Sequence, residues 1–161
     1  MTLQLAGSLA ERTAPLGDHC PIDRTMRLVG NRTAVLLLRE VFYGASRFDD
    51  LVRRVGVTEA VASQRLRELV DAGVLAKQPY REPGQRTRYE YVLTDAGHEL
   101  LPVLLALLQW GATHIPGGGP RLTHADCGEP VALVTRCAAG HDVPEEDLLV
   151  TGHPRLARST M

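Results

Sequence analysis

Residues 47–75, RFDDLVRRVGVTEAVASQRLRELVDAGVL, decide the fold of this chain because they predict two short helices with a tight break between them. In the first helix Phe48 and Leu51 recur at helical spacing, and Gly56 interrupts the pattern. Thr58 then stands where the cap of a second helix belongs. A short helix, a break and a second helix are together typical of a helix-turn-helix.

The second helix, predicted over residues 58–71, has one apolar face and one polar face. Ala62, Leu66 and Leu69 share one side at about 100° per residue. The polar side fits the major groove of DNA, where Arg pairs with guanine and Gln with adenine. The residues expected to contact bases are Ser63, Gln64 and Arg67, with Thr58 contacting a base or a phosphate at the helix start. An ordinary amphipathic pair of helices is the alternative interpretation.

The residues that follow predict a β-hairpin. The segment RYEYVLT at residues 88–94 alternates as a strand does, and a Pro-Gly pair marks the turn before it. A helix of this kind followed directly by a hairpin indicates a winged helix-turn-helix. Arg86 and Arg88 lie in or beside the hairpin tip and are predicted to contact phosphates or the minor groove. A solvated hairpin with ordinary surface arginines is the alternative.

Helical patterns flank this unit on both sides. Pro21 suits the first position of a helix that opens behind Cys20. Residues 32–43 are apolar nearly all round, which is typical of a buried central helix. Residues 96–115, AGHELLPVLLALLQWGATHI, predict a leucine-rich helix capped by the Thr-Asp pair before them.

The leucine-rich helix carries more apolar side chains than a monomer of this size can bury. One of its faces is therefore expected to pack against a second copy of the chain, together with a short helix predicted over residues 3–12. Pro102 either kinks the helix or marks a late first turn. The expected fold is α+β and mainly α: a winged helix-turn-helix with extra N- and C-terminal dimerisation helices and a small C-terminal β-rich extension.

Composition sets further limits. The chain has 161 residues, three cysteines and a formal net charge of −1. An odd number of cysteines does not build a disulfide framework, so a cytoplasmic location is expected, and no apolar run predicts a secretory signal or a membrane span. Residues 20–114 carry 13 Arg and Lys against 11 Asp and Glu, so any basic patch for nucleic acid must be local.

The end of the chain differs from the rest in its sequence pattern. The predicted division is an N-terminal arm at 1–19, a winged helix-turn-helix domain at 20–114, and a Gly/Pro linker with a small extension at 115–161. Strands are predicted at 131–135 and 148–150. The extension holds two His and two Cys at spacings conceivable for a degenerate zinc-ribbon-like site: His124, Cys127, Cys137 and His141. A small β-hairpin whose cysteines act as apolar fillers is the alternative.

Several unrelated short motifs occur in order along the chain. They are CPIDRTMRLVGNRTAVLLLRE from residue 20, RF at 47–48, QRLREL at 64–69 and YEYVLTDAGHELLPVLLALLQW from residue 89. In this order and spacing they resemble the HxlR-type family of bacterial transcriptional regulators. The resemblance implies a dimeric winged helix-turn-helix in which residues 58–71 form the recognition helix and residues 80–91 form the wing. One departure is Asn31-Arg32-Thr33, which stands where the family usually has a Lys-Trp pair.

The resemblance also makes Cys20 the family's N-terminal cysteine, through which several members sense electrophiles or oxidants. A thiol at a helix N-terminus lies near unpaired N–H groups and the positive end of the helix dipole, which stabilise a thiolate. A redox or electrophile switch at Cys20 is therefore one hypothesis. A half-buried, inert thiol in the dimer region is the alternative.

The expected function is a homodimeric, sequence-specific DNA-binding regulator, a repressor acting at a palindromic operator. Its switch is expected to be either the Cys20 thiol or a small ligand held between the central and leucine-rich helices. The alternative is a winged-helix sensor or protein-interaction module with little DNA affinity, which the low net charge and the acidic Glu59 favour. An enzyme is not expected, because the sequence shows no nucleophile–base constellation and no phosphate-cradling glycine loop.

Overall fold

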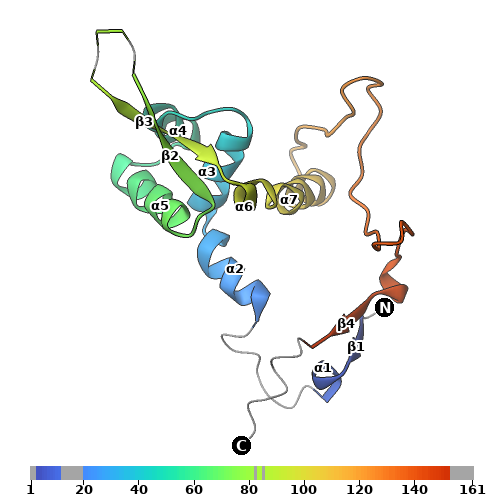
Figure 1. Ribbon diagram of the computed structural model, residues 1–161. Coiled ribbons are helices and arrows are strands. Elements are labelled where there is room, and N and C mark those ends of the chain that lie inside the picture. Colours follow the sequence, from blue (N-terminus) through green and yellow to red (C-terminus); the bar gives the residue numbers. More distant parts are fainter. Residues whose placement is uncertain (1–2, 12–19, 82, 85, 153–161) are drawn as a thin grey trace, which may run out of the picture. The chain divides into compact units, whose positions relative to one another are not determined.

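The structure, a computed structural model, describes residues 3–11, 20–81, 83–84 and 86–152 (Figure 1). These residues belong to two compact units. The larger unit covers residues 18–122, and the smaller unit joins residues 1–17 to residues 123–161. Parts of the predicted arm, wing and extension, including the end of the helix predicted over 3–12, lie outside the described residues. The predicted three-part division of the chain stays a prediction.

The larger unit is mainly helical, with one small sheet. Its helices are α2 (Pro21–Val29), α3 (Arg32–Phe42), α4 (Phe48–Val55), α5 (Glu59–Asp71), α6 (Asp95–His98) and α7 (Leu101–His114). Its strands are β2 (Leu75–Tyr80) and β3 (Arg88–Leu93), which pair antiparallel directly behind α5. This order of elements confirms the predicted α+β fold, mainly α, with a winged helix-turn-helix.

The core of the larger unit lies between α3, α4, α5 and β2. Its largest fully buried side chains are leucines: Leu37 and Leu38 of α3, Leu51 of α4, Leu66 and Leu69 of α5, and Leu75 of β2. Burying each such side chain contributes roughly 1.5–3 kcal/mol, so these six residues dominate the stability of the unit. Glu40 is the buried charged residue among the described residues, and its Oε1 accepts a hydrogen bond from Arg39 Nε at 3.0 Å.

Local side chains fix where the helices begin and end. Asn31 Oδ1 accepts from the Thr33 N–H at 2.8 Å and caps α3, a role that the sequence analysis did not assign. Thr58 caps α5 as predicted, with its Oγ1 accepting from the Val61 N–H at 3.4 Å. Gly56 ends α4 in the left-handed conformation, with φ of 70°, as a break between two helices requires.

A joint centred on Thr94 ties α6 to the residues that follow α5. The Thr94 Oγ1 accepts from the Gly97 N–H at 3.1 Å and donates to the Gly73 carbonyl at 2.5 Å. The Thr94 N–H donates to the Val74 carbonyl at 3.2 Å. A Cβ on Gly97 would lie 2.2 Å from that same carbonyl oxygen, so the close approach of α6 requires glycine.

The leucine-rich segment forms two helices rather than one. The break between α6 and α7 puts Pro102 at the second position of α7, which selects the late first turn over the kink. No residue of α7 is buried. Its large exposed side chains are Leu101, Val103, Leu107 and Trp110. None of the described helices is long and apolar enough to cross a membrane.

The smaller unit corrects two predictions. Residues 3–12 were predicted as a helix, which is wrong: β1 (Gln4–Ala6) pairs parallel with β4 (Leu149–Thr151), and only α1 (Ser8–Glu11) is helical. Pairing with a strand far along the chain overrides the local helical pattern here. The predicted strand at 131–135 is also wrong, because single bridges at Thr123–Pro130 and Arg136–Asp142 flank that segment instead. The strand predicted at 148–150 lies one residue later, and η2 (Glu145–Asp147) precedes it.

Candidate nucleic-acid interface

The polar face of α5 is turned to solvent. Gln64 and Arg67 are exposed, Ser63 is half-buried, and Thr58 is exposed at the helix start. The opposite face is fully buried through Ala62, Leu66 and Leu69. One side of α5 therefore holds the core, and the other is available for contact with another molecule.

Glu68 organises this polar face. Its Oε1 accepts from Gln64 Nε2 at 3.2 Å, and its Oε2 pairs with Arg65 Nη1 at 2.6 Å. The hydrogen bond from Arg65, followed by that from Gln64, holds the pKa of the Glu68 carboxyl below its usual value. Arg65 is thus an ion-pair partner within α5, whereas Arg67 stays exposed and donates from Nε to the Ser63 carbonyl at 3.4 Å.

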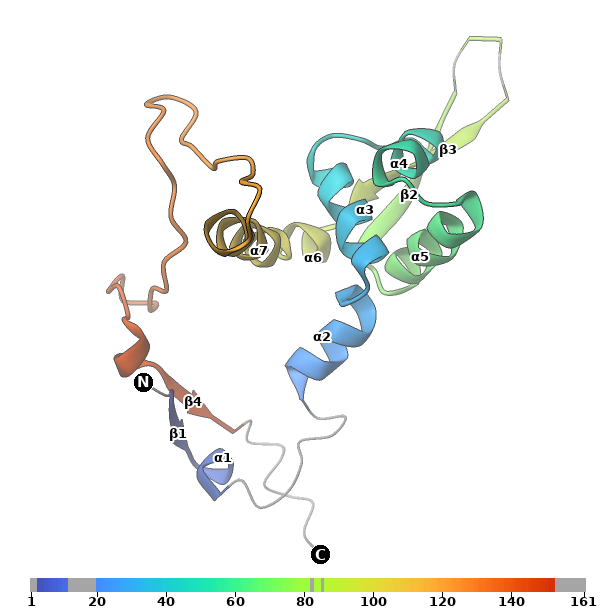
Figure 2. The same cartoon turned by 180° about the vertical axis from the view of Figure 1, so that it is seen from behind.

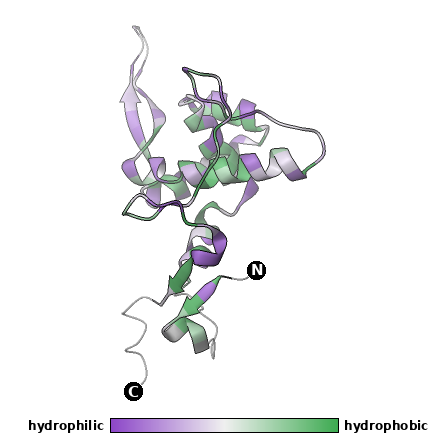
Figure 3. Ribbon diagram, turned by 90° about the vertical axis from the view of Figure 1, so that its right-hand side faces the viewer, coloured by the Kyte–Doolittle hydropathy of each residue, from purple (hydrophilic) through white to green (hydrophobic). Residues whose placement is uncertain are grey.

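The wing, residues 80–91, continues the antiparallel pair beside α5. The register runs from Leu75 opposite Leu93 to Tyr80 opposite Arg88. Arg86 and Arg88 are both exposed. Colouring by hydropathy shows the projecting hairpin as largely hydrophilic (Figure 3). A polar hairpin that bears arginines therefore lies next to the recognition helix, which packs on β2.

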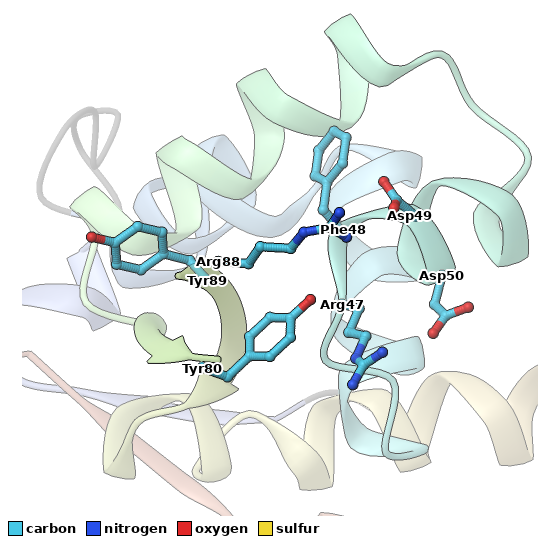
Figure 4. Close-up of a pocket in the computed structure, with 7 residues that line it drawn as sticks. All are labelled: Arg47, Phe48, Asp49, Asp50, Tyr80, Arg88 and Tyr89. Atoms are coloured by element: carbon cyan, nitrogen blue, oxygen red, sulfur yellow. The ribbon is translucent and has the colours of Figure 1, made fainter. Parts of the chain in front are cut away.

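A cleft of about 430 Å³ lies where the start of α4 meets the wing, and we call it the wing-root cleft. Its lining residues are Arg47, Phe48, Asp49, Asp50, Tyr80, Arg88 and Tyr89 (Figure 4). Two hydrogen bonds fasten its sides together: the Tyr91 N–H donates to the Ser46 carbonyl at 2.8 Å, and Ser46 Oγ donates to Glu90 at 2.7 Å. Views from both sides place α4 beside β3 (Figures 1 and 2).

Two arginines and a tyrosine ring define the chemistry of the wing-root cleft. The guanidinium carbon of Arg47 lies 4.9 Å from the centre of the Tyr80 ring, which is a cation–π contact. Tyr80 and Arg88 are register partners, so their side chains share one face of the hairpin. Asp50 forms an ion pair with Arg53 on α4. The cleft thus combines two arginines and aromatic rings with carboxylates on the α4 side.

Arg47 and Tyr80 were not predicted as site residues. Their contact depends on an antiparallel bridge between Arg47 and Glu90, which joins segments more than forty positions apart. Local periodicity cannot show such a pairing. The useful sequence feature was the RF pair at 47–48, which the family motif contained but which carried no assigned role.

An apolar groove of about 330 Å³ lies between α3 and α7. Val35 and Phe42 of α3 face Leu104 and Leu108 of α7 across it, and Arg39 supplies charge at its edge. The groove occupies the place where the sequence analysis put a small-ligand site. No ligand class follows from this lining, which is mainly apolar, with Phe42 and Tyr43 as its aromatic residues.

Cys20 is the N-cap residue of α2, as predicted, with Pro21 in the first turn. Its side chain forms no capping hydrogen bond and is half-buried. The thiol is therefore partly accessible at a helix N-terminus, the position that the switch hypothesis needs. Its reactivity stays a prediction.

The four residues predicted as zinc ligands lie in the smaller unit, and the structure brings only two of them together. His124 Nδ1 lies 3.2 Å from Cys127 Sγ. Cys137 and His141 are linked through the backbone, and backbone N–H groups, chiefly that of His141, lower the pKa of the Cys137 thiol. Within the described ranges, no three His, Cys, Asp or Glu side chains lie close enough to hold a metal ion. As placed, these residues do not fit a tetrahedral zinc ion.

Comparison with known proteins supports the winged-helix geometry. The family model described as HxlR-like helix-turn-helix matches residues 28–118. An HTH-type transcriptional regulator of Mycobacterium bovis is 38% identical over 122 residues, which cover 72% of this chain and 76% of the relative.

Two solved structures are also similar. PA1607, a proposed transcription factor, has a TM-score of 0.72 and 33% identity, over 84% of this chain and 96% of that chain. The reduced form of the redox regulator HypR has a TM-score of 0.53 and 26% identity, over 58% of this chain and 92% of that chain.

Proposed function

This chain belongs to the HxlR-like helix-turn-helix family and is a transcriptional regulator, and from that premise we propose that it is a homodimeric repressor of the cytoplasm that binds a palindromic operator. The observation that carries the proposal is the pairing of an exposed polar face on α5 with an arginine-bearing wing beside it. No catalytic role is proposed.

We assign base contacts in the major groove to Ser63, Gln64 and Arg67, with Thr58 at the helix start. Arg67 is exposed, and a guanidinium can donate to both acceptors of guanine. Gln64 keeps its carbonyl oxygen and one amide hydrogen while it donates to Glu68, and these are the groups that pair with adenine. Arg86 and Arg88 are assigned to phosphates or the minor groove.

The proposed dimer rests on α7. Leu107 and Trp110 are 55% and 60% exposed, although a helix of this composition is normally covered. A second copy is the simplest occupant, since a two-fold interface needs only a self-complementary surface and would place two α5 helices for a palindrome. Replacing both residues with Gln should halve the mass measured by sedimentation while the larger unit stays folded. An unchanged mass would contradict the dimer through α7.

The proposed switch is thiol chemistry at Cys20, where an electrophile adds to the sulfur and changes operator affinity. The half-buried thiol at the start of α2 supports this, as does the similarity to a protein described as a redox regulator. The test compares the parent with Cys20→Ser in the presence of quinone or diamide. If both release DNA equally, the switch lies elsewhere, and the groove between α3 and α7 becomes the candidate for a small effector.

The decisive experiment is a mobility-shift titration with DNA from upstream of the protein's own gene, at several salt concentrations. A regulator should form a specific complex whose affinity falls steeply with salt, because phosphate contacts release counterions. Arg67→Ala should cost about 1–3 kcal/mol and relax the preference at one base pair. Arg24→Ala, on the exposed surface of α2, is the matched control.

A protein-interaction module is the second candidate function. The carboxylates of Glu59 and Glu68 on α5 favour it, since both would repel nearby phosphates. A flat titration, with no specific complex at any salt concentration, would support this candidate over the regulator.

A further inference from the structure

The wing-root cleft lies between the wing and α4, the first helix of the helix-turn-helix. The start of α4 forms one side, and the wing forms the other. A duplex that meets α5 with its major groove and the wing with its minor groove has one backbone strand between those grooves. In a helix-turn-helix the first helix crosses the DNA backbone while the second enters the major groove, and the cleft lies at the start of that first helix, beside the wing.

From the geometry of this cleft we propose that it seats a phosphate of the DNA backbone, with Arg47 and Arg88 as the charged contacts and Tyr80 as the residue that positions Arg47. This inference rests on the proposed DNA-binding function and adds a contact surface to it. The ligand chemistry is a phosphodiester, which binds guanidinium groups through charge-assisted hydrogen bonds.

The position of the two arginines supports the proposal. Arg47 is held by the Tyr80 ring at 4.9 Å, and Arg88 projects from the strand position opposite Tyr80. Figure 4 shows Arg88 and Tyr80 extending from the wing toward Arg47 and Phe48 at the start of α4. Guanidinium groups from two different elements thus line one cleft, where both can donate hydrogen bonds to an anion.

The carboxylates of the cleft set a limit on which anions enter. Asp50 is neutralised by Arg53 at the rim, whereas Asp49 is exposed on the α4 side. The lining therefore offers two guanidinium groups, those of Arg47 and Arg88, beside the exposed carboxylate of Asp49. A singly charged phosphodiester suits this balance better than a dianionic ligand, because Asp49 repels the second charge.

The backbone of the cleft is fixed before DNA arrives. Ser46 bonds to both Tyr91 and Glu90, so the residue before Arg47 is part of the sheet edge. A preorganised contact loses little conformational entropy on binding. Arg47 therefore acts from a backbone position that hydrogen bonds hold in place.

The test measures binding of Arg47→Ala to operator DNA and to non-specific duplex over a range of salt concentrations. A phosphate contact predicts a loss of about tenfold on both DNAs, the size of one charge-assisted hydrogen bond. The log–log salt slope should become shallower by about 0.9 for each Arg47 that binds a phosphate. Arg47→Lys should keep the slope, and Arg24→Ala should match the parent in every measurement.

Two further arms make the assignment specific. A scan of the operator with single neutral methylphosphonate linkages should find a position that weakens the parent but not Arg47→Ala. Tyr80→Phe keeps the ring and should bind DNA like the parent. Tyr80→Leu removes the ring and should lose part of the DNA affinity that Arg47→Ala loses. That loss of affinity should be larger than any fall in the melting temperature of the protein accounts for.

The outcomes separate this inference from the proposed function. If the parent binds specifically and Arg47→Ala keeps the same affinity and slope, the phosphate seat is wrong while recognition by α5 stands. If Arg47→Ala loses affinity for the operator alone, Arg47 contacts a base and the seat is again wrong. A parent that binds no DNA overturns both proposals.

Discussion

α3 and α7 are both rich in apolar side chains, but α3 is part of the buried core and α7 is not. α3, RTAVLLLREVF, buries Leu37, Leu38 and Val41, whereas α7, LPVLLALLQWGATH, has no buried residue. The two helices contact each other, so α3 covers only one side of α7. An apolar sequence therefore indicates that a helix will be covered, but it does not indicate whether the same chain provides the cover.

The largest expected effect tests this contrast with one substitution in each helix. Leu37 is 0% exposed and Leu107 is 55% exposed. Leu37→Ala should lower the free energy of unfolding by about 2–5 kcal/mol, because it leaves a cavity in the core. Leu107→Ala should change it by less than about 0.5 kcal/mol in the monomer. Urea denaturation followed by circular dichroism measures both.

Repeating the unfolding measurement at several protein concentrations tests the same contrast further. If a second copy covers α7, Leu107→Ala becomes destabilising at concentrations where the dimer forms, since dimerisation stabilises by mass action. Leu37→Ala should be destabilising at every concentration. A Leu107→Ala effect that is large and independent of concentration would contradict the contrast between the helices.

A glycine in the packed helix α6 and a glycine in the exposed helix α7 give the next largest effect. Gly97→Ala should cost about 1–3 kcal/mol, because its Cβ would lie 2.2 Å from the Val74 carbonyl oxygen. Gly111→Ala, within α7, meets only the Ile115 Cδ1 at 4.0 Å. It should stabilise the helix by about 0.5–1 kcal/mol, the usual gain of Ala over Gly. Thermal unfolding compares the two, and equal effects would show that α6 is not tightly packed.

The smallest effect concerns how α3 begins. Asn31→Ala removes the hydrogen bond from the Thr33 N–H and should cost about 1 kcal/mol. Asn31→Asp or Asn31→Ser keeps a capping oxygen and should stay within a few tenths of a kcal/mol of the parent. A loss shared by all three variants would point to packing of Asn31 rather than to its cap.

Local patterns were sufficient for the recognition unit. The helix cap at Thr58, the break at Gly56 and the buried face of α5 all depend on residues close together in sequence, and the structure confirms them. The same holds for the hairpin, whose alternation at 88–93 is local.

Features formed by distant segments could not be predicted in this way. β1 is a strand only because residues 149–151 pair with it, and the wing-root cleft exists only because Arg47 lies beside Glu90. The structure does not support the predicted zinc site, for a related reason. Spacing brought His124 and Cys127 together, but it did not determine how the second pair would fold back on the first.

The joint at Thr94 has a consequence for operator architecture. It bonds the residues that end α5 to the start of α6, and Leu100 and Leu104 pack the following turn against the core. In a dimer held by α7, this joint would fix the distance between the two recognition helices. Inserting one base pair at the operator centre moves the two half-sites apart by about 3.4 Å. Because the distance between the two α5 helices is fixed, the dimer could not bind both half-sites of the longer operator, and the insertion should abolish binding.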